Sequence, residues 1–112
     1  MDPATLNLTI HRGRDFIKDF IFLKEDGTPE DISLWEFKSE IREEKCIESP
    51  LLATFKIYRD VANGRIRLAL TDQETFAIPE GTAYWDLLVT IYTIDESYIC
   101  GKVKVKCCPT EV

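Results

Sequence analysis

Apolar and charged side chains alternate along the stretch Trp35-Glu36-Phe37-Lys38-Ser39-Glu40-Ile41-Arg42. In a β-strand this alternation places Trp35, Phe37 and Ile41 on one face and the charged side chains on the other. Glutamate, lysine and arginine are also good helix formers. A helix, however, would spread the three apolar side chains over roughly 240° of its circumference. The stretch therefore predicts a half-buried strand with Trp35 in the core.

The same two-residue period recurs along the chain, between segments rich in turn residues. Glu25–Pro29 is typical of a turn, and Thr71–Glu74 has the pattern of a capping box that opens one short helical turn. The second strand is apolar on both faces, which predicts either a central strand or one covered by another surface. The predicted strands lie roughly at residues 5–11, 16–24, 35–45, 52–59, 65–70, 83–93 and 98–107.

These elements define an all-β fold class. About seven short strands separated by turns predict an antiparallel immunoglobulin-like β-sandwich with one short helical turn. The 112 residues suffice for one core, so residues 1–112 are expected to form a single domain. The second and sixth strands contain no cysteine, so the disulfide that joins the sheets of many secreted immunoglobulin domains is not expected.

Composition and motifs give no indication of catalysis. The formal net charge of −6 disfavours nucleic acid and anionic membranes as partners, and no apolar run is long enough for a transmembrane helix. The sequence lacks phosphate-loop, dinucleotide-binding, zinc-protease and nucleophile-elbow motifs, and His11 is its single histidine. We expect no enzymatic activity, cofactor, metal or small-molecule substrate. No signal peptide is visible at the N-terminus.

The cysteines are predicted to be free thiols. Without a secretion signal, an even number of cysteines is better explained by a reducing compartment than by disulfides. A thiolate zinc site needs two close pairs, which the spacing here does not provide. One disulfide and a metal site are the less favoured alternatives. The four residues are Cys46, Cys100, Cys107 and Cys108.

Two sets of outward-facing residues are candidates for a protein interface. Apolar and tyrosine side chains on the second face of a strand suit a partly wet contact with another chain, although loops covering that face are an equal alternative. A row of lysines on the last strand is either a dock for an acidic neighbour, a solvated face or a guarded sheet edge. The first set is Ile17, Ile21, Leu23, Tyr58, Tyr84, Leu88 and Tyr92; the second is Lys102, Lys104 and Lys106.

The order of the motifs is more specific than the fold. It runs from His11-Arg12-Gly13-Arg14-Asp15-Phe16 through Glu25–Ile32, Trp35–Arg42, Gly64–Leu70, Thr71–Pro79 with Thr75 at its middle, and Pro79–Leu87 to Gly101–Val105. In this order, residues 6–107 resemble a widespread class of small immunoglobulin-like domains of tailed bacteriophages and prophages. They are similar to the N-terminal module of phage baseplate upper proteins, which attaches receptor-binding parts to the tail. Four cysteines are more than this class leads us to expect.

The resemblance implies a structural protein of the phage virion. It implies a non-enzymatic connector in the tail, baseplate or fibre-attachment region, assembled in the host cytoplasm. Its partners would be other phage structural proteins, with self-association as a further option. No stalk or receptor-binding head follows residue 107, so these partners are expected on other chains. A standalone adhesion or carbohydrate-binding sandwich and a capsid decoration protein are the alternatives.

Overall fold

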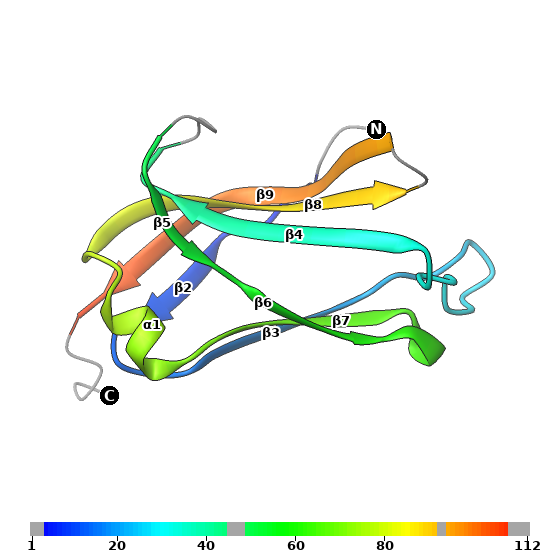
Figure 1. The fold of residues 1–112 in the computed structure, drawn as a ribbon, viewed down its shortest axis with the longest axis horizontal. Coiled ribbons are helices and arrows are strands. Elements are labelled where there is room, and N and C mark those ends of the chain that lie inside the picture. Colours follow the sequence, from blue (N-terminus) through cyan, green and yellow to red (C-terminus); the bar gives the residue numbers. More distant parts are fainter. Residues whose placement is uncertain (1–3, 45–48, 92–93, 108–112) are drawn as a thin grey trace.

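The chain folds into two β-sheets that face each other across a common core (Figure 1). The computed structural model describes residues 4–44, 49–91 and 94–107. None of the helices described there is long and apolar enough to cross a membrane. The elements are β1 (Ala4–Thr5), β2 (Leu8–His11), β3 (Phe16–Ile21), β4 (Trp35–Arg42), β5 (Leu51–Thr54), β6 (Lys56–Asp60), the 3-10 turn η1 (Val61–Asn63), β7 (Arg65–Leu70), α1 (Asp72–Phe76), β8 (Gly81–Ile91) and β9 (Ile94–Lys106).

The larger sheet has the order β1-β9-β8-β4-β5, with β2 also paired to β9, and the smaller sheet has the order β3-β7-β6. Among the described strands, β1 and β2 run parallel to β9, whereas the other pairs are antiparallel. The predicted immunoglobulin-like sandwich is confirmed, and the parallel edge is a departure from the antiparallel arrangement. Nine strands are described, because two of the predicted strands are each divided.

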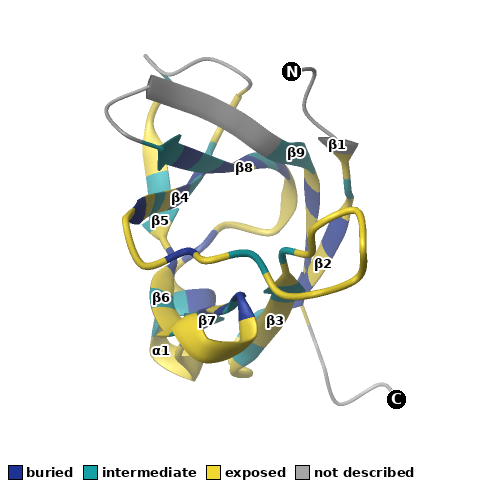
Figure 2. Ribbon diagram, turned by 90° about the vertical axis from the view of Figure 1, so that its right-hand side faces the viewer, coloured by how far each residue is buried: buried dark blue, intermediate teal, exposed yellow. Residues whose placement is uncertain are grey.

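Alternation along each strand decides which side chains form the core (Figure 2). On β4, Trp35 is 8% exposed and Ile41 is fully buried, which confirms the strand that the sequence predicts there. Ser39 shares this inner face and is also fully buried, but its hydroxyl donates a hydrogen bond of 2.6 Å to the backbone carbonyl of Asp86. A buried hydroxyl without such a partner would be costly, so this bond lets a serine occupy a core position.

Aromatic rings join the two sheets. Three phenylalanines lie on one face of the predicted second strand. Each is close to another aromatic ring, either in the larger sheet or at Phe55. Phe16 lies 5.8 Å from Phe55, Phe20 stacks on Trp85 at 6.0 Å, and Phe22 meets Trp35 at 5.4 Å. Such pairs add roughly 0.5–1.5 kcal/mol each beyond the burial of their area. They hold the smaller sheet against the larger one.

The strand predicted at residues 52–59 is in fact two strands in different sheets. β5 pairs with β4, whereas β6 pairs with β7. The chain passes from one sheet to the other at Phe55, which is 3% exposed and whose amide donates to the carbonyl of Ser39. The buried ring holds the crossing point in the core, and the alternation of apolar residues continues through it, so the sequence pattern shows no break.

Three other predicted boundaries are corrected. The second strand, β3, is an edge strand and not a central one, because it pairs only with β7 among the described strands. The predicted strand 5–11 is divided into β1 and β2, and between them the carbonyl of Leu6 accepts a hydrogen bond from the indole of Trp85. Asp95-Glu96-Ser97, which lies between the predicted strands 83–93 and 98–107, belongs to β9, whose backbone already pairs with β8 from Ile94.

The short helix α1 fastens the turn between β2 and β3. The predicted capping box is confirmed: the Thr71 hydroxyl accepts from the amide of Glu74, and the Glu74 carboxylate accepts from the amide of Thr71. Thr75 is fully buried, accepts from the amide of Gly13 at 3.0 Å and donates to the carbonyl of Arg14 at 2.8 Å. These bonds join Thr75 to the turn at Gly13, so two members of the motif series meet in the structure.

Candidate functional site

The candidate interface residues fall on two separate surfaces, one on the outer face of each sheet. Ile17, Ile21 and Tyr58 project from β3 and β6 of the smaller sheet, whereas Tyr84 and Leu88 project from β8 of the larger sheet. The outer faces of a sandwich lie on opposite sides of the molecule (Figure 1). The sequence-based idea of one patch that combines the two groups is therefore wrong, because alternation shows that a side chain points outward but not from which sheet.

The outer face of the smaller sheet, here called the small-sheet face, is a grid of three rows across β3, β7 and β6. Each row is defined by the pairing register. The rows are Ile17-Ala69-Lys56, Asp19-Arg67-Tyr58 and Ile21-Arg65-Asp60. Ile17, Ile21 and Tyr58 are 56%, 59% and 58% exposed. These large side chains are open to solvent, so loops do not cover them.

Ion pairs lie between the apolar residues of the small-sheet face. Arg67 binds Asp19 with two hydrogen bonds, of 2.7 and 3.1 Å, and Arg65 contacts Asp60 at 3.0 Å. The bond from Arg67 is the main reason why the pKa of Asp19 lies below its ordinary value. The pKa of Asp60 is lowered mainly by the Asn63 amide, with Arg65 adding to the effect. Both carboxylates are therefore charged and paired at neutral pH.

A shallow groove of about 530 Å³ runs over the small-sheet face. Its floor is formed by β7, and Ile17 lies on one side and Tyr58 on the other. The groove holds paired charges and apolar side chains, and no group of three or more metal-ligating side chains occurs anywhere in the described part of the chain. Its surface is suited to contact with another protein surface.

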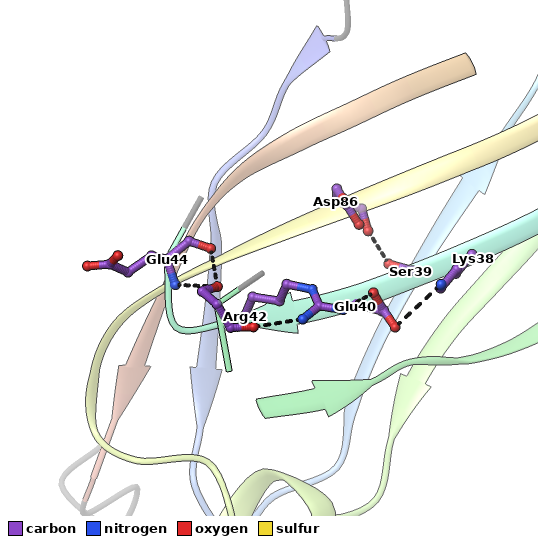
Figure 3. A network of polar contacts seen from close by, with 7 residues as sticks. Lys38, Ser39, Glu40, Arg42, Glu44 and Asp86 are labelled. Carbon is purple, nitrogen blue, oxygen red and sulfur yellow. Dashed lines mark hydrogen bonds and ion pairs between the residues drawn. The ribbon is translucent and has the colours of Figure 1, made fainter. Parts of the chain in front are cut away.

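The outer face of the larger sheet, here called the large-sheet face, holds the other candidate residues. Tyr84 and Leu88 are half-buried, and Lys102 and Lys104 are exposed on β9. Tyr84 and Leu88 border a second groove of about 230 Å³, which Lys38, Glu40 and Arg42 of β4 also line. Glu40 lies 3.0 Å from Arg42 and 3.8 Å from Lys38 (Figure 3). Arg42 also donates to the carbonyl of Ser49, so its guanidinium is held in place.

Asp86 lies on the large-sheet face, and its pKa is raised above the ordinary value. Burial against neighbouring side chains is the main cause, and the carboxylate of Glu40 on the adjacent strand adds to it. A hydrogen bond with the backbone of Glu40 acts in the opposite direction, as do the charges of Arg42 and Lys38. The arrangement is a pair of neighbouring carboxylates between two cations. It makes a polar, charge-patterned surface around the apolar contacts of Tyr84 and Leu88.

Replacing Asp86 with asparagine is expected to stabilise the domain slightly at neutral pH. A raised pKa means that the folded protein binds the proton more readily than the unfolded chain, so stability falls as pH rises through the titration of Asp86. Because Asp86 is exposed to solvent, water screens this effect, and the gain at pH 7 should be well below about 1 kcal/mol. Urea denaturation against pH measures it. The difference between variant and wild type should vanish below pH 3.8, the ordinary pKa of Asp86, and a variant that is less stable at pH 7 would contradict this account.

The remaining candidate residues are the lysine row of the last strand, Leu23, Tyr92 and the cysteines. Lys102, Lys104 and Lys106 are exposed on β9; because β9 lies between β8 and the pair β1 and β2, their role as guards of a sheet edge is wrong. Leu23 is 55% exposed and lies beyond the end of β3. Cys100 is a free thiol, as expected. Tyr92, Cys46 and Cys108 lie outside the described residues.

Sequence reasoning missed the charged members of the small-sheet face. Asp19 lies between Ile17 and Ile21 in the alternation, and Arg65 and Arg67 alternate with the buried residues of β7, so their outward direction could have been inferred. Their pairing could not, because the register between β3 and β7 joins residues that are 48 positions apart.

The class of protein is thus an immunoglobulin-like β-sandwich. No family model matches the chain, and no curated protein matches it. One similar solved structure is the crystal structure of the Lin-41 filamin domain. It is 12% identical in sequence, with 88% of this chain and 82% of that chain covered and a TM-score of 0.49. This similarity says nothing of function.

Proposed function

We propose that this chain is a non-enzymatic connector in a phage virion, in the tail, baseplate or fibre-attachment region. One observation carries the proposal: the sandwich has two separate surfaces on opposite sides, and each combines apolar side chains with charged ones. A connector must hold two neighbours at once, and a rigid sandwich with two such faces keeps them at a constant distance. The resemblance of the motif series to phage domains supplies the virion context.

The large-sheet face is the surface proposed to bind a different protein of the particle. Leu88 and Tyr84 provide apolar and aromatic contact area near its middle, and a buried aromatic anchor is common among energetically important interface residues. Lys102 on β9 pairs with Tyr84 across the strands and Lys104 lies further along β9, so an acidic neighbour would be steered toward this face. Charges at the border of an interface contribute mainly to association rate and orientation.

The test uses particles purified from a host that carries the gene. The wild-type chain should co-purify with virions, and cryo-electron microscopy should place it at the tail, baseplate or fibre attachment. Density on the capsid shell would instead identify a decoration protein, and a chain absent from particles would contradict the virion role and favour a standalone adhesion or carbohydrate-binding domain.

The face is tested by Leu88→Asp combined with Tyr84→Asp. Both side chains point outward, so the variant should fold, as checked by circular dichroism, and yet its incorporation should fall by roughly tenfold or more. Leu34→Asp is the matched control, because Leu34 is a 66% exposed leucine in the turn before β4, outside the strands that form the two faces. Normal incorporation of a folded double variant would exclude this face as the binding surface.

A further inference from the structure

We propose that the small-sheet face is the contact between two copies of this chain, related by a two-fold axis that runs along the row Asp19-Arg67-Tyr58. The inference goes beyond the connector role and does not need it, because self-association can be measured on the isolated chain in solution. The occupant is inferred from the exposure of the face, from the protection of the sheet edges and from the pattern of side chains that the register creates.

Three of the large apolar residues that are exposed in the described part of the chain share this face. Ile17, Ile21 and Tyr58 are each more than half exposed. Ile17 and Tyr58 line the groove, and Ile21 lies on the same side of β3 as Ile17. Scattered exposed apolar residues are normal, but a cluster on a single sheet face marks an interaction site. Ala69 lies between Ile17 and Lys56 on the central strand, so a small side chain leaves room for a neighbour to approach.

The edges of the smaller sheet are protected, so the contact must use the face. Lys18 alternates with the outward residues of β3 and lies on the same side as the core-directed Phe16 and Phe20. It nevertheless remains exposed on this edge strand. At the opposite edge, Arg59 lies on the same side of β6 as Ile57. Its guanidinium donates to the carbonyl of Ile32 and lies over the ring of Phe37. A charged residue on the inward-facing side of an edge strand opposes the addition of another strand.

The pattern of the face is complementary to itself. A rotation of 180° about the middle row exchanges the two outer rows, so Ile17 of one copy lies over Ile21 of the other. The same rotation brings Lys56 over Asp60 of the second copy and places Tyr58 over its own equivalent. These residues thus meet partners of matching chemistry, as a closed two-fold contact requires.

Charge at the centre opposes this arrangement only weakly. Asp19 and Arg67 lie on the axis and face their own equivalents, but each copy brings the two side chains already joined by two hydrogen bonds. The whole chain carries a net charge of −6, whereas the face has three cationic and two anionic side chains. The face therefore lacks the negative excess of the whole chain, which reduces the repulsion between two acidic chains that approach through it.

The size of the face predicts a weak dimer. Three strands about 4.8 Å apart, with six residues at about 3.3 Å each, cover roughly 400 Å² once their side chains are included. The pair would bury on the order of 800 Å², which is below the size of a standard stable interface. We therefore expect a dissociation constant on the order of 0.1 mM, a value at which dimers form only where copies are concentrated.

The experiment uses two single variants and their mixture. Ile17→Asp places a carboxylate over Ile21 at both symmetric contacts, and Ile21→Arg places a guanidinium over Ile17 in the same way. Each variant alone should raise the dissociation constant by roughly tenfold or more in sedimentation equilibrium. In an equimolar mixture, the new carboxylate of one copy faces the new guanidinium of the other, and the second contact remains Ile21 over Ile17. The mixed dimer should recover affinity to within about threefold of wild type.

The controls make each outcome decisive. Circular dichroism confirms that the variants fold, and Leu34→Asp, which introduces an aspartate outside the face, should dimerise like wild type. A wild-type chain that stays monomeric up to about 1 mM overturns the proposal and leaves this face for a different protein. Single variants that associate like wild type also overturn it. Single variants that weaken association without recovery on mixing overturn the two-fold arrangement.

Discussion

Trp85→Ala is expected to destabilise the domain by about 3–5 kcal/mol. The indole is 3% exposed, stacks on Phe20 of the opposite sheet at 6.0 Å and meets Phe55 edge-on at 6.3 Å. Its removal leaves a cavity at the point where the two sheets and the crossing strand meet. Domains of this size have total stabilities of only about 5–15 kcal/mol, so the variant should lose a large part of its stability. Chemical denaturation followed by circular dichroism gives the change in free energy.

Trp85→Phe separates packing from hydrogen bonding. The indole nitrogen donates to the carbonyl of Leu6 at 2.8 Å, so phenylalanine keeps much of the ring contact and leaves that carbonyl without its donor. The expected loss is about 1–2 kcal/mol, clearly smaller than for alanine. An alanine variant that loses less than about 1 kcal/mol would mean that Trp85 does not join the sheets.

Gly101→Ala is expected to destabilise the domain by about 3 kcal/mol, a large effect for one added methyl group. A Cβ atom at this position would lie 2.1 Å from the carbonyl oxygen of Leu6 and 2.7 Å from its carbon. Both atoms belong to the backbone and cannot turn away. The segment between β1 and β2 must therefore move off β9, and Trp85 loses its acceptor.

Local hydrogen exchange distinguishes this mechanism from general unfolding. The amide of Leu6 donates to the carbonyl of Cys100 at 2.9 Å, and its protection should fall much further than that of amides in β7. Gly27→Ala is the control: its φ of 88° makes alanine unfavourable, but nothing lies within 4 Å of the added atom. It should cost about 1–2 kcal/mol and leave the exchange of Leu6 unchanged. Equal effects of both variants would contradict the steric explanation.

Local features of this protein were predictable from its sequence alone. Alternation assigned Trp35 and Ile41 to the core, and it placed Ile17 and Ile21 together on one face of their strand, because successive side chains of a strand point to opposite faces whatever lies beside them. The capping box at Thr71 and Glu74 was equally predictable, since its two hydrogen bonds join residues three positions apart. These features depend on a few neighbouring residues.

The packing of the whole chain decides to which sheet each outward face belongs and which residues meet on that face. The alternation passes through Phe55 without a break although the chain changes sheets there. The pairing of Asp19 with Arg67 and the approach of Gly101 to Leu6 depend on the register between strands far apart in the sequence. Register is selected by the packing of whole strands against a shared core, so no local pattern contains it, and the two surfaces of this protein follow from that selection.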